Sequence, residues 1–487
     1  MALLSSVPIA AVPPDRFEPL IGPAAYRRLT ERFARARDLL GGHAMWNINS
    51  TSRGGGVAEM LVSLLAYARG AGIDGRWEVI EGDEPFFRVT KRIHNQLHGE
   101  EGDGLPLDQA ARERYESVTH AAGEELASRV APGDIVLLHD PQTVGMIPAL
   151  KRRGVPVVWR CHVGADGSNS LMSTARNFLR DYLRQADAYV FSREQYVWED
   201  LDPGKTVLIA PSIDAFSPKN QELSGSQVAG ILAAAGLQEA VAAGDPSFVR
   251  MDGSPGRVER HAEVDEWRRL RPDDTVVLQV SRWDRLKDPL GVIDGFVRYV
   301  LPRSTAHLVY AGPSVESVAD DPEGKGVLEE ASARFASLPS RDRERLHLAT
   351  LPMADFEENA AIVNALQRRA QVVVQKSIAE GFGLTVAEAM WKRRPVVASR
   401  IGGIQDQIVD GRSGRLVRPR DPAGYGEAVR GLLDDPGYAA SMGEEAYRRV
   451  RGGYLGTRSL LQYIALFERV LVGEGPPADA SLESGYA

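Results

Sequence analysis

The sequence predicts an α/β protein built from two β-α domains, each with a parallel sheet. Two series of short apolar segments predict this class, one within residues 44–209 and the other within residues 275–398, and helical or loop stretches separate the segments of each series. Strands that alternate with helices pair in parallel, because each helix returns the chain across the sheet. Residues 210–220, with prolines and short polar side chains, mark the boundary between the two series.

Length and composition agree with this division. The chain has 487 residues, of which 43% are hydrophobic and 25% charged, as expected for two or three globular domains. A net charge of −8 argues against a general nucleic-acid binder, so any anionic ligand must be held by local basic groups. The single cysteine, Cys161, excludes internal disulfides and cysteine-based metal clusters.

No targeting or membrane signal is visible in the sequence. Residues 1–13 are mildly apolar, but prolines interrupt them and they lack a basic n-region, so they do not resemble a signal peptide. No stretch is long and apolar enough to span a bilayer. Together with the lone cysteine, these features lead us to expect a cytoplasmic protein.

The first domain begins with an arginine-rich helical pattern over residues 26–40. Its strands are expected at residues 44–50, 76–80, 134–138, 155–159, 188–191 and 206–209. In parallel sheets ligands bind beyond the carboxyl ends of the strands, so the residues that follow each strand are the first candidates for a site.

The first such candidate is a glycine loop. Gly54, Gly55 and Gly56 follow the first strand and precede an amphipathic helix that starts near Val57. This order is typical of a phosphate-cradling turn, although the loop matches neither the G-x-G-x-x-G nor the Walker pattern. The alternative is a tight connection. We favour a ligand, because consecutive glycines cost considerable folding entropy.

Two further strand ends carry polar side chains that could contact a sugar. His139 and Asp140 follow one strand, His162 follows another, and a polar cluster occupies residues 91–98. A hydrogen-bonded structural role is the ordinary interpretation of any one of these histidines. Two histidines at neighbouring strand ends favour a sugar contact by His162 and Asp140. No spacing of histidines and carboxylates suggests a metal site.

The second domain repeats the β-α pattern. We expect its strands at residues 275–280, 307–310, 346–349, 371–375 and 395–398, after a helix-like and then loop-rich stretch over residues 223–271. Another glycine turn follows the last of these strands at residues 400–404. A final helix is expected at residues 459–472.

The most informative motif of the second domain is a glycine turn flanked by two carboxylates, Glu380 and Glu388. Between them lie Gly381, Phe382, Gly383 and Leu384, where a strand ends and a helix starts. Glycines let a ligand approach the backbone, and a helix start offers free N–H groups to an anion. A nucleotide sugar, with hydroxyls and phosphates, suits this arrangement. The alternative is a capping box between Thr385 and Glu388.

A cationic loop, residues 281–289, follows the first strand of the same domain. Arg282 can hold a phosphate in bidentate fashion, and Lys287 can add a point charge. An exposed charged loop is the ordinary alternative. Its position favours a site, because this loop and the Glu380 loop both lie at carboxyl ends of one predicted sheet.

These motifs together resemble the retaining GT-B glycosyltransferases. Within that fold, residues 46–57, 76–82, 87–98, 139–142, 159–162 and 211–220 are similar to the trehalose glycosyltransferring synthase and trehalose phosphorylase group. The resemblance covers about residues 44–454 and departs at about 238–264, which looks like an insertion at one edge of the site.

The resemblance implies two Rossmann-like domains that face each other across a cleft. They would span residues 1–215 and 216–456, with a helix at 457–475 crossing back to the first domain. The polar composition of residues 476–487 predicts a disordered tail. The implied donor site comprises Arg282 and Lys287 on the diphosphate, Glu388 on the ribose, Glu380 with the amides of Gly381, Phe382, Gly383 and Leu384 on the sugar, and Gly54, Gly55 and Gly56 against the phosphates. His162 and Asp140 would contact the donor sugar and the acceptor.

The leading hypothesis is transfer of glucose from UDP-, ADP- or GDP-glucose to a sugar acceptor, with glucose the first candidate, to form trehalose with retention. Three alternatives stay open: a trehalose phosphorylase using glucose 1-phosphate, a transferase with another sugar acceptor, and a non-catalytic nucleotide-sugar binder. We expect no cofactor and no resident metal, although Mg²⁺ could accompany the diphosphate. The resemblance also allows a homodimer.

Overall fold

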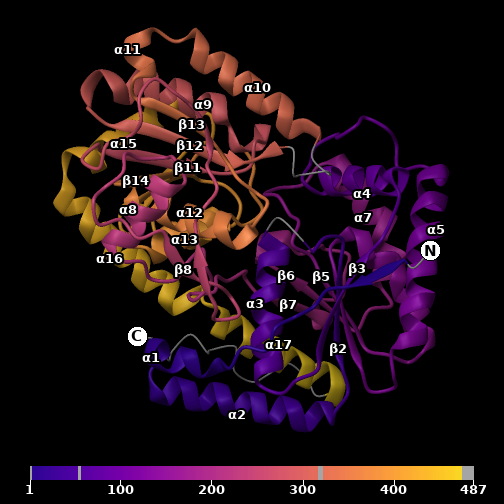
Figure 1. Cartoon of the computed structure of the whole chain (residues 1–487). Coiled ribbons are helices and arrows are strands. Elements are labelled where there is room, and N and C mark those ends of the chain that lie inside the picture. The colour runs from indigo at the N-terminus through magenta and orange to yellow at the C-terminus, as the bar shows by residue number, and fades with distance from the viewer. Residues whose placement is uncertain (1–2, 53–55, 316–321, 474–487) are drawn as a thin grey trace. The chain divides into compact units, whose positions relative to one another are not determined.

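The structure is a computed structural model that describes residues 3–52, 56–315 and 322–473 (Figure 1). The chain divides into two compact units. The first contains the chain up to Ser212 together with the segment from Gly456 onward, and the second contains residues Ile213–Leu455. Each unit is built around its own seven-stranded sheet, which confirms the predicted α/β class with parallel sheets.

The sheet of the first unit has the strand order β1-β3-β2-β4-β5-β6-β7. All pairs are parallel except β1 with β3. The strands are β1 (Leu4–Ser6), β2 (Met45–Asn49), β3 (Gly75–Ile80), β4 (Ile135–His139), β5 (Val157–Arg160), β6 (Ala188–Phe191) and β7 (Thr206–Leu208). The six predicted strands therefore form with small changes at their ends, whereas the short strand β1 was not predicted.

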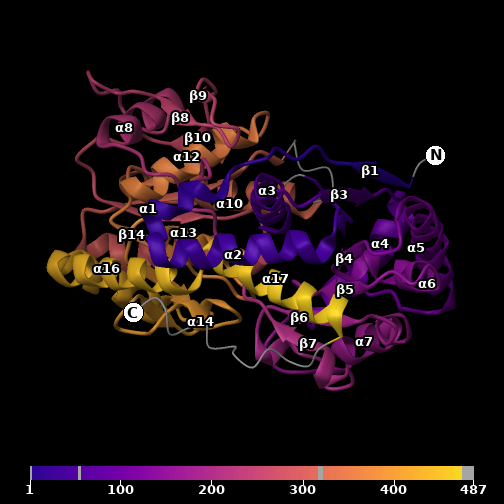
Figure 2. The ribbon, with the colours of Figure 1, turned by 90° about the horizontal axis from the view of Figure 1, so that it is seen from below.

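The first unit also contains α-helices that pack around this sheet. They are α1 (Glu18–Ile21), α2 (Pro23–Leu40), α3 (Gly56–Gly70), α4 (Glu84–Leu97), α5 (Gln109–Arg129), α6 (Ile147–Arg152), α7 (Ser170–Leu183) and α17 (Gly456–Val472). The C-terminal helix α17 lies beside α2 (Figure 2), where Glu468 pairs with Arg32 and Arg35 at 3.0 Å. Its inner face buries Leu460, Tyr463 and Phe467.

The sheet of the second unit has the strand order β10-β13-β12-β11-β14-β15-β16, with only the β10–β13 pair antiparallel among these described strands. The strands are β10 (Glu263–Glu266), β11 (Val276–Val280), β12 (His307–Pro313), β13 (Leu346–Leu351), β14 (Val372–Gln375), β15 (Val396–Ser399) and β16 (Arg415–Val417). The helices are α8 (Gly225–Ala234), α9 (Pro289–Gly295), α10 (Pro322–Ser337), α11 (Ser340–Arg343), α12 (Phe356–Arg369), α13 (Leu384–Trp391), α14 (Ile404–Gln407), α15 (Pro422–Asp434) and α16 (Pro436–Gly453).

The stretch expected to be helical and then loop-rich is more ordered than the sequence suggested. After α8 it forms a hairpin of β8 (Ser247–Val249) and β9 (Pro255–Arg257), and then β10 joins the edge of the sheet. The hairpin is fixed to α12, because Arg250 pairs with Asp355 at 2.6 Å and with Glu357 at 3.1 Å. These strands have three or four residues each, and β10 carries three carboxylates, so no apolar run marked them.

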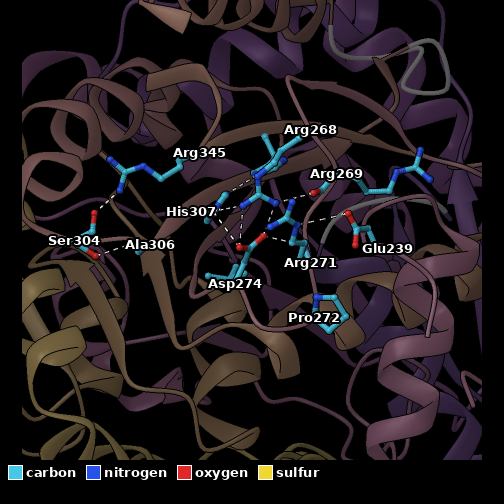
Figure 3. Close-up of polar contacts among 12 residues, drawn as sticks. Glu239, Arg268, Arg269, Arg271, Pro272, Asp274, Ser304, Ala306, His307 and Arg345 are labelled. Atoms are coloured by element: carbon cyan, nitrogen blue, oxygen red, sulfur yellow. Dashed lines mark hydrogen bonds and ion pairs between the residues drawn. The ribbon is translucent and has the colours of Figure 1, made fainter. Parts of the chain in front are cut away.

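A buried polar cluster closes the amino-terminal edge of the second sheet. His307, at the start of β12, lies 3.4 Å from Asp274 and 2.9 Å from Arg268, and these side chains point toward one another (Figure 3). The other ring nitrogen of His307 lies 3.0 Å from His347, which in turn contacts Glu266 of β10 at 2.8 Å. The cluster therefore ties the edge strand to the amino ends of β12 and β13.

None of the helices in the described part of the chain is long and apolar enough to cross a membrane.

Candidate active site

In both units the candidate residues lie at the point where the order of the sheet reverses. In the first unit β2 lies between β3, the next strand along the chain, and β4. In the second unit β11 lies between β12, the next strand along the chain, and β14. Ligands of open α/β sheets bind beyond the carboxyl ends of strands at such a reversal. Asp140 follows β4, Lys287 follows β11 and Glu380 follows β14, so these three side chains occupy the expected positions.

The second unit brings Lys287 and Glu380 into direct contact. Lys287 Nζ lies 2.5 Å from Glu380 Oε2, and the two side chains are 15% and 13% exposed. Ser377 donates a further hydrogen bond to the same carboxylate oxygen at 3.3 Å. An ammonium group and a carboxylate so placed can receive a phosphate and a sugar hydroxyl, respectively, of one ligand.

The glycine turn between the two carboxylates leads directly into α13. Gly383 adopts a φ of +81°, a conformation that favours glycine, and no side chain within the described residues caps the helix that follows. Gly403 lies against this turn and donates its N–H to the Gly381 carbonyl at 3.0 Å, so close that a Cβ there would lie 2.8 Å from Phe382 Cα. The Val386 N–H donates to the Gly383 carbonyl at 3.0 Å, so the amides of the first turn that could face an anion are those before Val386.

The capping-box interpretation of Thr385 and Glu388 is wrong. The residue that caps α13 is Gly383, and Glu388 lies in the second turn of the helix, 4% exposed. Lys219 Nζ approaches the Glu388 carboxylate at 3.8 Å, and Lys392, the residue that follows α13, donates to the Glu388 carbonyl at 3.1 Å. Burial holds the pKa of Lys392 well below its usual range, while the Glu388 carboxylate opposes that shift.

Arg282 lies at the exposed side of the same loop. Its side chain is 49% exposed and contacts Asp284 at 3.1 Å. Asp284 in turn accepts the N–H of Leu286 at 2.8 Å, which starts the short turn that carries Lys287. The loop therefore holds Arg282 at its exposed side and Lys287 at greater depth.

In the first unit, Asp140 is the residue under most conformational constraint. Its φ of 61° and ψ of 177° lie in a region that is favourable essentially only for glycine. The conformation is held because the Asp140 N–H donates to the Arg160 carbonyl at 2.8 Å and the carboxylate accepts the His162 N–H at 2.7 Å. Burial raises the pKa of Asp140 to about 7, against the opposing effects of the His162 N–H and Arg160.

His162 and His139 form a directed chain of hydrogen bonds. Arg160 Nε, which can only donate, lies 3.5 Å from His162 Nδ1, and His162 Nε2 lies 3.1 Å from His139 Nδ1. His139 Nε2 then lies 3.1 Å from Asn47 Oδ1. Both rings are neutral in this arrangement, and burial lowers the pKa of His139 to about 3 and that of His162 well below its usual range. The ring nitrogens of His162 are therefore engaged within the protein.

The predicted phosphate loop is only partly described. Gly54 and Gly55 lie outside the described residues, whereas Gly56 is the first residue of α3. Among the residues that the structure does describe, no group of three or more histidine, cysteine, aspartate or glutamate side chains is placed to hold a metal ion.

The sequence analysis did not identify several buried residues that interact with the candidate site residues. Burial raises the pKa of Tyr463 of α17, and the charges of Arg160 and Asp140 shift it in opposite directions. In the second unit Gln279 and Lys376 lie under the Lys287 and Glu380 loops. A polar residue inside an apolar strand, such as Gln279 in Val276–Val280, is a signal that could have identified Gln279.

Comparison with known proteins agrees with this architecture. Residues 47–198 match the family model of the trehalose synthase N-terminal domain, and residues 262–449 match that of the glycosyl transferases group 1. The chain is 34% identical over 452 residues to the trehalose synthase of Thermococcus litoralis, which covers 93% of this chain and 96% of that relative.

Two further similarities are more distant. The chain is 27% identical over 409 residues to the trehalose phosphorylase of Pleurotus pulmonarius, covering 80% of this chain but 51%, or about half, of that relative. An alpha,alpha-trehalose-phosphate synthase (UDP-forming) from Burkholderia vietnamiensis has a similar structure, with a TM-score of 0.63 at 14% identity over 88% of this chain and 97% of that chain.

Two parallel-sheet units and these similarities define a GT-B glycosyltransferase, a hexosyltransferase. Within that class, the chain belongs to the trehalose synthase family.

Proposed function

We propose that this protein transfers glucose from a nucleoside-diphosphate-glucose to glucose and so forms trehalose. One observation carries the proposal: Lys287 and Glu380 are in contact at 2.5 Å, from two different loops, beside the uncapped start of α13. A nucleotide sugar has its diphosphate directly joined to the sugar, so a cation and a carboxylate side by side match that junction. The family of the chain supports trehalose as the product.

The chemistry expected of this site follows from charge. Breaking the bond between the sugar and the diphosphate leaves negative charge on the phosphate and positive charge on the sugar ring. Lys287, Arg282 and the α13 amides would stabilise the departing diphosphate, and each such preorganised donor is typically worth about 3 kcal/mol. Glu380 would hold the hydroxyls of the sugar, Glu388 would bind the ribose, and the amides of Gly381 and Leu384 would lie against the donor.

Asp140 is the group we assign to the sugar hydroxyls on the first unit. One oxygen of its carboxylate accepts the His162 N–H at 2.7 Å, and its raised pKa of about 7 suits proton exchange near neutral pH. His162 would contact the sugar through its backbone or its ring edge, because both ring nitrogens are engaged. Retention would arise if the acceptor attacks on the face that the diphosphate leaves, with the phosphate taking the proton.

A phosphorylase is the second candidate, because the chain is 27% identical to a trehalose phosphorylase. A screen of donors against acceptors separates the two. We expect α,α-trehalose, identified by NMR, from glucose with at least one of UDP-, ADP- and GDP-glucose. Trehalose formed from glucose 1-phosphate with no response to any nucleotide sugar would instead show a phosphorylase, and a different linkage or acceptor would show another transferase.

Metal dependence is tested by the same assay. No grouping of carboxylates and histidines in the described residues suggests a resident metal, and lysine and arginine side chains can supply the charge that a metal would bring. We therefore expect full turnover after dialysis against EDTA. A loss of activity that added Mg²⁺ restores would contradict this proposal.

A further inference from the structure

The side chain of Gln279 lies beneath the two loops of the donor site. It is the fourth residue of β11, between apolar neighbours, and it is fully buried at 0% exposure. Burying a carboxamide costs free energy unless all its polar atoms are hydrogen-bonded. The presence of glutamine inside this strand therefore calls for partners that use both ends of the amide.

Gln279 hydrogen-bonds to the backbone of both loops, and its Nε2 also lies 3.4 Å from the hydroxyl oxygens of Ser281 and Tyr310. Its Nε2 donates to the backbone carbonyl of Lys287 at 2.9 Å, and its Oε1 accepts the backbone N–H of Lys376 at 3.1 Å. A carbonyl can only accept and an N–H can only donate, so these partners fix the orientation of the amide. The carboxamide thus joins the backbone of the loop after β11 to the backbone of the loop after β14.

Two further contacts hold the same pair of loops together. The N–H of Ile378 donates to the Leu286 carbonyl at 2.7 Å, and the buried ammonium group of Lys376 pairs with Asp288. Asp288 itself adopts the left-handed helical conformation, with a φ of 54°, which aspartate tolerates better than most residues other than glycine. The loops are therefore joined at several points, and Gln279 is the contact that acts on the backbone of Lys287 itself.

We propose that Gln279 is a positioning residue of the donor site. It fixes the position and orientation of Lys287 relative to Glu380. The ammonium group and the carboxylate are therefore held, before the donor binds, at the separation that the sugar–diphosphate junction needs. This assignment rests on the proposed function, because it gives Lys287 and Glu380 their roles. Displacing a positioned group by about 1 Å can cost about a hundredfold in rate, so the amide controls turnover without touching the substrate.

The test compares Gln279→Glu and Gln279→Leu with a matched control, Gln238→Leu. Gln238 is also buried, at 3% exposure, and accepts a hydrogen bond from Arg369 at 3.0 Å away from these loops. For both Gln279 variants we expect kcat to fall between about ten- and a hundredfold, and UDP, ADP or GDP to bind more weakly by isothermal titration calorimetry, with little change in the acceptor KM. The control should lower the melting temperature and leave kcat within about twofold.

A pH profile distinguishes positioning from a loss of stability. In Gln279→Glu the carboxylate faces the Lys287 carbonyl without a proton to donate, and burial raises the pKa of such a group. We therefore expect its kcat relative to the wild type to rise as the pH falls toward 5, because protonation restores the donor. Gln279→Leu, which cannot regain a donor, should show no such recovery.

Hydrogen exchange tests the inference independently of the reaction. The amides of residues 285–288 and 376–380 should exchange faster in both Gln279 variants and at the wild-type rate in Gln238→Leu. A wild-type protein that transfers sugar from no nucleotide sugar would refute the proposed function. Faster hydrogen exchange in the Gln279 variants would still support the role of Gln279 in holding the two loops. Unchanged hydrogen exchange in the Gln279 variants would overturn the role of Gln279. The same conclusion would follow if a Gln279 variant lost no more turnover than Gln238→Leu when both had lost the same amount of melting temperature.

Discussion

At the scale of single residues, we expect substitution of Lys287 to reduce activity strongly and to change stability little. Its ammonium group contacts Glu380 and is partly exposed, so removing it opens no cavity in the core. We expect Lys287→Ala to reduce kcat by about a hundredfold or more while the melting temperature changes little, because one preorganised donor is worth roughly 3 kcal/mol. Steady-state kinetics and thermal unfolding measure the two effects.

The matched control for this prediction is Arg285, two residues earlier in the same turn. Its side chain is 57% exposed and pairs with Glu330 at 2.5 Å. A pair of this kind contributes little to stability or to a neighbouring site. Arg285→Ala should keep kcat near the wild-type value, and near-normal activity of Lys287→Ala would remove Lys287 from the site.

Asp140 illustrates how function and stability oppose each other at one position. Its folded pKa of about 7 lies above its unfolded value, so the charge costs stability once the pH exceeds about 4, and the cost grows until about pH 7. Asp140→Asn removes the charge and keeps the size of the side chain. We expect this variant to lose most of its activity and to gain about 1–2 kcal/mol of stability at pH 8, allowing for partial exposure.

The pH dependence checks the cause of that gain. The difference in unfolding free energy between Asp140→Asn and the wild type should be close to zero at pH 4 and largest above pH 7. Urea unfolding at several pH values measures it. A gain that is equal at pH 4 and pH 8 would attribute the effect to backbone conformation rather than to the buried charge.

At the scale of an element, the edge strand β10 depends on the protonation of His307. Burial lowers the pKa of His307 to about 4, below its unfolded value, although Asp274 opposes the shift. A lowered histidine pKa gives stability that is complete above about pH 6.5 and is lost as the pH falls to about 4. We expect roughly 3 kcal/mol of acid-linked destabilisation from this residue.

The charged groups around His307 set the window of this effect. Asp274, Arg268, Arg345 and His347 face it from neighbouring segments, and the pKa of Asp274 is lowered to about 2, so that Asp274 loses its contribution only in stronger acid. In His307→Phe the stability should be lower at pH 8 but should change less between pH 6.5 and pH 4. Hydrogen exchange of β10 over this range should follow the same difference, and identical profiles would contradict it.

At the scale of the whole molecule, the C-terminal helix is required by the N-terminal unit. α17 buries Leu460, Leu461, Ile464, Leu466 and Phe467. Burial of each such side chain is worth about 2 kcal/mol, and the sum is comparable with the whole stability of a domain. A chain that ends at Leu455 should therefore lose the folded first unit, seen as a missing transition in calorimetry. Two intact transitions would contradict this prediction.

Most of the fold could be predicted from the sequence, because its signals are local. Apolar runs such as Val276–Val280 and the helical pattern of Pro23–Leu40 need no distant partner to be recognised. Glycine turns and cations after such strands also indicated Lys287 and Glu380, since the carboxyl ends of parallel strands share one edge. The hairpin β8–β9 was missed because its strands have only three residues each, and strand β10 was missed because its pairing with β13 depends on residues far away in the chain.

The sequence by itself determined the class of fold, the family and the kinds of residue that occupy the ends of the strands. Only the tertiary structure decided how those residues act on one another: the contact between Lys287 and Glu380, the strained backbone and raised pKa of Asp140, and the hydrogen bonds of Gln279 to two loops. The physical reason is that periodicity reports which side chains are buried, whereas distance and desolvation arise only when strands remote in sequence become neighbours in a sheet.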